Sequence, residues 1–123
     1  MVVYRVQDSE GRGPWRPGFS HRWVEDRDDH ANLPPWMLEI GPVHRRALSG
    51  EHIGSACETL GQLQRWFTES EYRTLLGLGY RCVAIGGARV LGRSNTQCVI
   101  ASVTPLRVIA ATVDLYPQLQ VSP

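Results

Sequence analysis

Residues 55–79 read SACETLGQLQRWFTESEYRTLLGLG, and this stretch decides the fold class. A capping-box pattern, a hydroxyl residue followed by a glutamate one helical turn later, occurs at Ser55 and Glu58 and again at Thr68 and Glu71. Each pattern precedes apolar residues at helical spacing, and glycines close the stretch. The stretch therefore predicts two consecutive short helices, each with one apolar face to bury.

Strand-like segments lie on both sides of these helices. They are Val2–Val6, His21–Val24, Tyr80–Ile85, Gln97–Val103 and Leu106–Val113. Short strands that follow one another along the chain favour antiparallel pairing. We expect an α+β fold, in which an antiparallel sheet of about four to five strands carries the two helices.

The chain has the size of a single domain, residues 1–123. We expect an irregular, loop-rich N-terminal part (8–54), a helical part (55–78) and a strand-rich part (80–116). No apolar run approaches the ~20 residues of a membrane span, and the N-terminus lacks the pattern of a secretory signal. These features predict a cytoplasmic protein without a membrane partner.

The cysteines and histidines do not form a metal-binding motif. Cys57, Cys82 and Cys98 lie too far apart for a CxxC pair, and the histidines show neither HxH nor HxxxH spacing. We therefore predict no metal site and three reduced, buried thiols. Two alternatives stay open: a Cys82–Cys98 disulfide, and a reactive Cys57 near the start of the first predicted helix.

The segment Gly11–Ser20 reads GRGPWRPGFS and combines turn-forming residues with arginine and aromatic side chains. Loops of this composition are used for recognition or are packed onto the core. The candidate partner-binding residues in and after this segment are Arg12, Trp15, Arg16, Phe19, Trp23 and Trp36. In the alternative interpretation, Trp15 and Phe19 close the core over the sheet.

All 13 basic residues are arginines, and the net charge is only +1. The whole chain is therefore not a broadly basic binder of nucleic acid. Residues 76–113, however, contain no acidic residue and four arginines, Arg81, Arg89, Arg93 and Arg107. A nucleic-acid-binding module that uses these four side chains is a further alternative.

The order of motifs from Tyr4 to Ile100 resembles small uncharacterised phage and prophage proteins. A Tyr-Arg strand is followed by a helix ending in Leu-x-x-Trp-Phe, a polar turn and a Gln-x-Val-Ile strand. A Gly-Arg-Gly-Pro-aromatic-Arg-Pro-Gly-Phe-Ser segment comes after the first strand. The resemblance implies a protein of a mobile element that acts in the cytoplasm of a bacterial host. Among such proteins, anti-CRISPR inhibitors fit the size and the lack of a catalytic motif, and their partners are host proteins or ribonucleoprotein complexes.

The same arrangement resembles the ADP-ribosyltransferase fold, in which an early Arg or His, a middle Ser or Tyr and a late Glu hold NAD. By position, the counterparts here are Arg5, Ser55 and Gln97. This resemblance implies NAD as the ligand, whereas the first one requires no cofactor. Gln97 stands where the late carboxylate would stabilise an oxocarbenium-like transition state, and a neutral amide lacks that charge. Whether the protein is an enzyme is left open, with binding favoured over catalysis.

Overall fold

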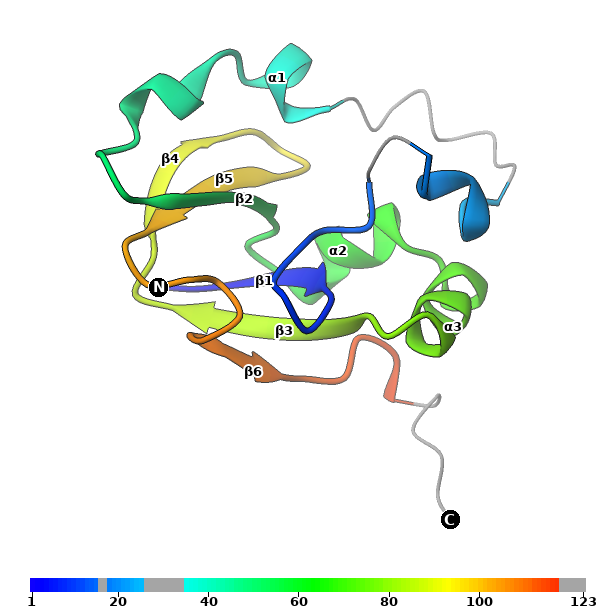
Figure 1. The fold of residues 1–123 in the computed structure, drawn as a ribbon. Coiled ribbons are helices and arrows are strands. Elements are labelled where there is room, and N and C mark those ends of the chain that lie inside the picture. The colour runs from blue at the N-terminus through cyan, green and yellow to red at the C-terminus, as the bar shows by residue number, and fades with distance from the viewer. Residues whose placement is uncertain (16–17, 26–34, 118–123) are drawn as a thin grey trace.

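The computed structural model describes residues 1–15, 18–25 and 35–117. Its strands form two antiparallel sheets, which lie one above the other in Figure 1. The first sheet has the order β1–β3–β6, with bounds Val2–Gln7, Arg81–Gly86 and Ala110–Thr112. The second sheet has the order β2–β5–β4, with bounds His52–Ala56, Cys98–Ser102 and Arg89–Arg93.

Short helices cover the two sheets. The α-helices are α1 (Trp36–Glu39), α2 (Leu60–Trp66) and α3 (Glu69–Gly77). Within the described ranges, 3-10 helices span Ser20–Arg22 and Val43–Arg46. In Figure 1, α1 lies above the second sheet, and α2 and α3 lie together at one end of the first.

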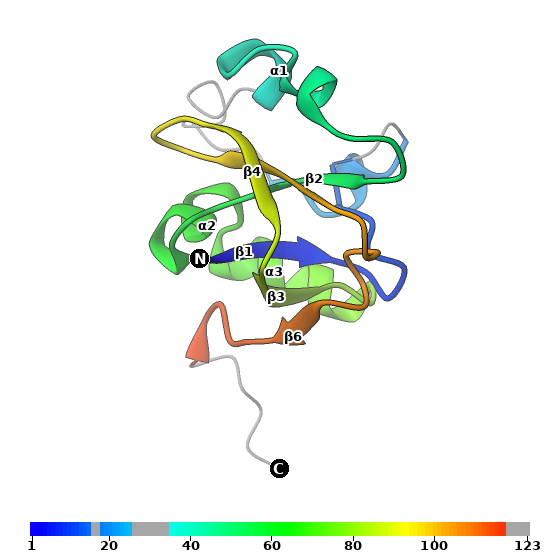
Figure 2. The ribbon, with the colours of Figure 1, turned by 90° about the vertical axis from the view of Figure 1, so that its left-hand side faces the viewer.

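One residue pair joins β1 to the end of β2. Tyr4 and Cys57 exchange two backbone hydrogen bonds of 2.8 Å each. Cys57 directly follows β2, so β1 and β2 run near each other, as both ribbon views show (Figures 1 and 2). Side chains from both sheets therefore meet at this junction.

The first helix begins later than the sequence predicts. Thr59 is its cap, because the Thr59 hydroxyl accepts from the Gln62 amide at 3.0 Å and the Gln62 side chain accepts from the Thr59 amide at 3.3 Å. Ser55 does not cap a helix, because it pairs with Val99 between β2 and β5. The helical part predicted for residues 55–78 is thus corrected at its start.

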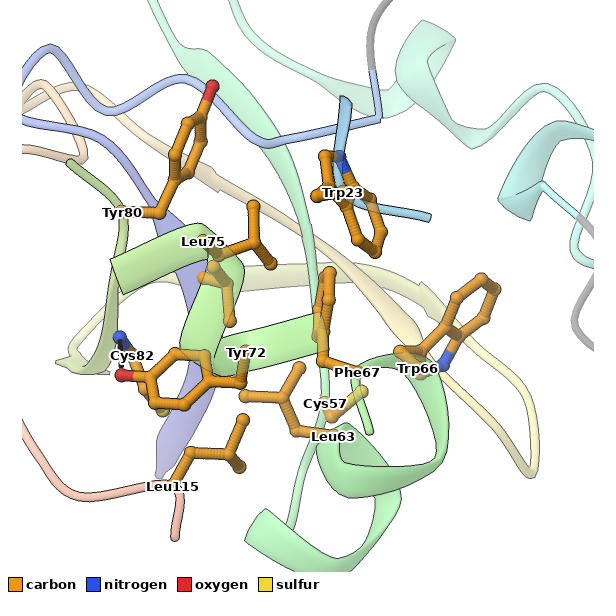
Figure 3. Close-up of a cluster of buried hydrophobic side chains, with 11 residues drawn as sticks. Trp23, Cys57, Leu63, Trp66, Phe67, Tyr72, Leu75, Tyr80, Cys82 and Leu115 are labelled. Atoms are coloured by element: carbon orange, nitrogen blue, oxygen red, sulfur yellow. Dashed lines mark hydrogen bonds between the residues drawn. The ribbon is translucent and has the colours of Figure 1, made fainter. Parts of the chain in front are cut away.

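The second predicted cap is confirmed. Thr68 and Glu71 form a capping box at the start of α3, which turns Tyr72 toward β3. The Tyr72 hydroxyl accepts from the Cys82 amide at 2.8 Å, inside a buried cluster shown in Figure 3. That cluster consists of Val6, Trp23, Cys57, Leu63, Trp66, Phe67, Tyr72, Leu75, Tyr80, Cys82 and Leu115.

The α+β class is confirmed, although the strands divide between two sheets. The predicted strand at residues 21–24 is wrong, since a 3-10 helix leads there into buried Trp23, whose indole donates to the Pro14 carbonyl at 3.1 Å. The predicted strand at residues 106–113 shortens to β6, because a turn in which Val108 donates to the Pro105 carbonyl precedes it. The sequence analysis did not predict β2 and β4, which contain glycine and polar residues.

All three cysteines are free and buried, as predicted. Burial raises the pKa of the Cys57 and Cys82 thiols to about 12 and that of Cys98 to about 11. A thiol that stays protonated is a poor nucleophile. The structure therefore supports neither the disulfide nor the reactive-Cys57 alternative.

Candidate functional site

A cleft with a volume of about 510 Å³ opens at the junction between β1 and β2. We call it the aromatic cleft, and its lining includes Arg5, Trp15, Trp36, Ser55, Trp66 and Gln97. The three residues that the ADP-ribosyltransferase resemblance selects, Arg5, Ser55 and Gln97, thus line one cavity. Sequence separation alone could not place them together, because they lie on different strands or strand ends.

Arg5 on β1 is a buried cation beside this cleft. Its side chain is held by three hydrogen bonds of 2.8 Å, to the Gln7 side chain and to the backbone carbonyls of Gly11 and Ser55. Only 6% of Arg5 is exposed, and burial lowers its pKa to about 10, against a smaller opposing effect of Asp8. Within the described ranges no carboxylate forms an ion pair with Arg5, so its charge is available to attract an anion.

Gly54 makes room for the arginine. A Cβ atom at this position would overlap Nη1 of Arg5 and would lie 2.8 Å from a methyl carbon of Leu106. Any other residue at position 54 would therefore push Arg5 or Leu106 away. The glycine in β2 is part of the site, although the sequence analysis did not identify it.

Ser55 and Gln97 approach the cleft from neighbouring strands. Ser55 pairs with Val99 of β5, so their side chains lie on the same face of the second sheet, the face on which Trp36 packs. Gln97 precedes β5 and is 5% exposed. Its side-chain amide donates to Glu39 of α1 at 3.1 Å.

Glu39 is a site residue that the sequence analysis missed, since no motif marks it. Its Oε1 accepts from the Gln97 amide, from the Thr96 hydroxyl at 2.6 Å and from the Ser94 hydroxyl. Burial opposes ionisation of Glu39, but the three hydrogen bonds together outweigh it and lower the pKa of the carboxyl group. A carboxylate is therefore held in hydrogen-bond contact with the Gln97 side chain.

Tryptophan rings form the apolar wall of the cleft. Trp15 is 45% exposed and meets Trp23 edge-on, with ring centroids 4.6 Å apart, and Trp66 at 6.4 Å. The Trp66 indole donates to the Thr96 carbonyl at 3.0 Å, which ties this wall to the turn that carries Gln97. Cavities of this size with apolar walls and a few fixed polar groups are typical small-molecule sites.

The predicted partner-binding residues lie in different environments. Trp23 is 2% exposed, so this candidate is corrected: its ring belongs to the core because it packs against Phe67 at 5.3 Å. Phe19 is half-buried against Tyr80, in line with core closure. Arg12 is exposed and pairs with neighbouring acids, whereas Arg16 lies outside the described residues.

The four arginines proposed for nucleic-acid binding do not form one surface of unpaired charge. Arg89 pairs with Glu51 at 2.8 Å, and Arg93 pairs with Glu58 at 3.3 Å. Arg81 and Arg107 line a separate depression of about 320 Å³. Nucleic-acid binding by these residues remains a prediction.

In the part of the chain that the structure describes, no cluster of histidine, cysteine and acidic side chains could hold a metal ion. Across the same residues, none of the helices has the length and apolar character needed to cross a membrane.

Comparison with known proteins gives one match. Neither the curated proteins nor the solved structures include a significant match to the chain. The sequence profile of a family described as bacteriophage T4 Y00F protein matches residues 1–108, which is most of the chain. The protein therefore belongs to the bacteriophage T4 Y00F protein family.

Proposed function

We propose that this phage protein binds a nicotinamide dinucleotide, or its ADP-ribosyl part, in the aromatic cleft while it acts in the cytoplasm of the bacterial host. The observation that carries the proposal is that Arg5, Ser55 and Gln97 line one cleft. The resemblance to ADP-ribosyltransferases selects these three residues without reference to their positions in space.

The chemistry of the cleft suits the two parts of such a ligand. A dinucleotide carries anionic phosphates and flat aromatic rings. The buried Arg5 guanidinium offers a positive charge that forms no ion pair among the described residues, and Trp15 and Trp36 offer apolar ring surface. The volume of about 510 Å³ falls within the usual range for small-molecule sites.

The proposal favours binding over catalysis. An ADP-ribosyltransferase-like reaction needs a carboxylate in direct contact with the ribose as its glycosidic bond breaks. Gln97 presents an amide at the position of the late carboxylate. We therefore expect the protein to retain the ligand without transferring ADP-ribose to a host target.

Calorimetric titration with NAD⁺ and with ADP-ribose tests the proposal. We expect binding by the wild type and at least roughly ten-fold weaker binding by Ser55→Leu, whose larger side chain would fill the cleft. Ser49→Leu, in an exposed turn, is the matched control and should bind like the wild type. Circular dichroism checks that both variants fold.

Two results would change this conclusion. Wild-type protein that binds neither NAD⁺ nor ADP-ribose, or Ser55→Leu that binds as well as Ser49→Leu, would refute a ligand site in the cleft. Transfer of label from labelled NAD⁺ to a host protein would show that the protein is an enzyme despite Gln97.

A second candidate function is the binding of a host macromolecule, such as a defence complex that an anti-CRISPR-type protein would block. The observation that favours it is the 45% exposure of Trp15 in the Gly11–Ser20 loop, because exposed tryptophans often dominate protein interfaces. With purified host defence complexes, Trp15→Ala combined with Arg16→Ala should lose about 2 kcal/mol or more of binding free energy. Equal retention of the complex by wild type and variant would exclude this loop as the interface.

A further inference from the structure

The aromatic cleft has a negative charge as well as a positive one. Glu39 lies on α1, one helical turn after Trp36, so both side chains lie on the same face of that helix. Trp36 lines the cleft, and the Glu39 carboxylate lies 3.1 Å from the side-chain nitrogen of Gln97, which also lines it. The carboxylate therefore lies one hydrogen bond away from a residue that lines the cavity.

The hydrogen bonds of Glu39 leave part of its carboxylate available. Donors from Ser94, Thr96 and Gln97 all reach Oε1, and among the described residues none donates to Oε2. No arginine among these residues forms an ion pair with Glu39. Among the described residues, neutral groups hold the negative charge in place, and no cation pairs with it.

We propose that Glu39 makes the cleft selective for the oxidised, pyridinium form of a nicotinamide dinucleotide over the reduced form. This inference rests on the proposed function. The pyridinium ring of NAD⁺ carries a positive charge, which the dihydropyridine ring of NADH lacks, while the rest of the two molecules is the same. A carboxylate fixed one hydrogen bond away from the cleft attracts the charged ring of the first more strongly than the neutral ring of the second, and Arg5 attracts the phosphates of both.

Glu39 also positions Gln97. Because the Gln97 nitrogen donates to Glu39, the orientation of the amide is set by this contact. The carboxylate accordingly acts through two routes, by its charge and by the orientation of the neighbouring amide. It is a positioning and specificity residue, since it does not itself line the cavity.

The test is the ratio of the dissociation constants for NADH and NAD⁺, measured by calorimetry at one ionic strength. We expect the wild type to prefer NAD⁺ by a factor on the order of ten. Glu39→Gln, which keeps an oxygen acceptor for the three donors but removes the charge, should bring this ratio close to unity. Glu51→Gln is the matched control, since Glu51 is a paired carboxylate that does not line the cleft, and it should keep the wild-type ratio.

Each outcome separates this inference from the proposed function. Equal affinity of the wild type for NAD⁺ and NADH, or an unchanged ratio in Glu39→Gln, would overturn the role of Glu39 while leaving the ligand site intact. Absence of binding of either dinucleotide would overturn both. The wild-type ratio alone decides the first point, so the test does not depend on the folding of a variant.

Discussion

At the scale of single residues, the cleft depends on the close packing of the Arg5 side chain against Gly54, where a side chain would leave no room for it. Arg5 is buried and makes three hydrogen bonds, two of them to the backbone carbonyls of Gly11 and Ser55. Gly54 provides the space through which its guanidinium reaches Ser55. The sequence gives no sign that Arg5 on β1 contacts Gly54 on β2, because local patterns report only neighbours along the chain.

Replacing this glycine should damage both stability and the site. Gly54→Ala places a methyl group against Nη1 of Arg5 and a Leu106 methyl, so we expect a loss of about 1–3 kcal/mol in unfolding free energy. Denaturant unfolding measures the change. Gly61→Ala is the control, because its Cβ would have no neighbour closer than 3.9 Å in α2 and should stabilise the helix by up to about 1 kcal/mol. Equal effects of the two substitutions would contradict the steric role of Gly54.

At the scale of secondary-structure elements, local signals set the helices but not their first residues. The Thr68–Glu71 box starts α3 as predicted, whereas the same kind of pattern at Ser55–Glu58 does not start a helix. Residues 52–56 instead form backbone hydrogen bonds with β5 as strand β2. A capping box at Thr59 and Gln62, a few residues later, starts α2. Tertiary pairing therefore overrides one of two similar local signals.

The start of β2 is also held to β4 by a charged pair whose contribution depends on pH. Glu51 accepts two hydrogen bonds from Arg89 at 2.8 and 3.1 Å and one from the Leu48 amide at 2.6 Å, and together these bonds lower its pKa to about 2, with Arg89 making the largest contribution. In the unfolded chain a glutamate titrates near a pKa of about 4.3. A group whose pKa is lower in the folded state stabilises the fold above its unfolded pKa and loses this effect as the pH falls through the folded value.

We therefore expect the melting temperature of Glu51→Gln to fall below that of the wild type at neutral pH. The difference should shrink as the pH falls from about 4.3 toward 2. Thermal melts over this pH range measure it, and the same experiment with Arg89→Gln completes a double-mutant cycle. A difference that stays constant down to pH 2 would rule out the ion pair as its source.

At the scale of the whole molecule, the candidate site exists only because two sheets meet. Arg5 comes from the first sheet, and Ser55 and Gln97 come from the second sheet and its approach. The Tyr4–Cys57 bridge brings these elements together, and Trp66 of α2 completes one wall. The site and the junction between the sheets therefore share residues, since Arg5 and Cys57 at the junction also line the cleft.

The sequence by itself determined the α+β class, the two consecutive helices, the strands β1, β3 and β5, part of the segment that forms β6, and the buried state of the thiols. These features depend on neighbours along the chain: the apolar period of a helix, the hydroxyl–glutamate caps, and runs of β-branched residues. Membership of a phage protein family also follows from the order of residues alone. The resemblance to ADP-ribosyltransferases selected Arg5, Ser55 and Gln97 as candidate ligand-binding residues, but the sequence did not show that they line one cleft.

Only the tertiary structure decided how the strands divide between sheets, which tryptophan is buried, and where the charges of the cleft lie. Trp15 and Trp23 have the same chemistry in the same loop region, yet one is 45% exposed and the other 2%. Glu39 and Gln97 are 58 positions apart, and Gly54 meets Arg5 across 49 positions of chain. Contacts of this range arise from packing of the complete chain, and no local pattern encodes them.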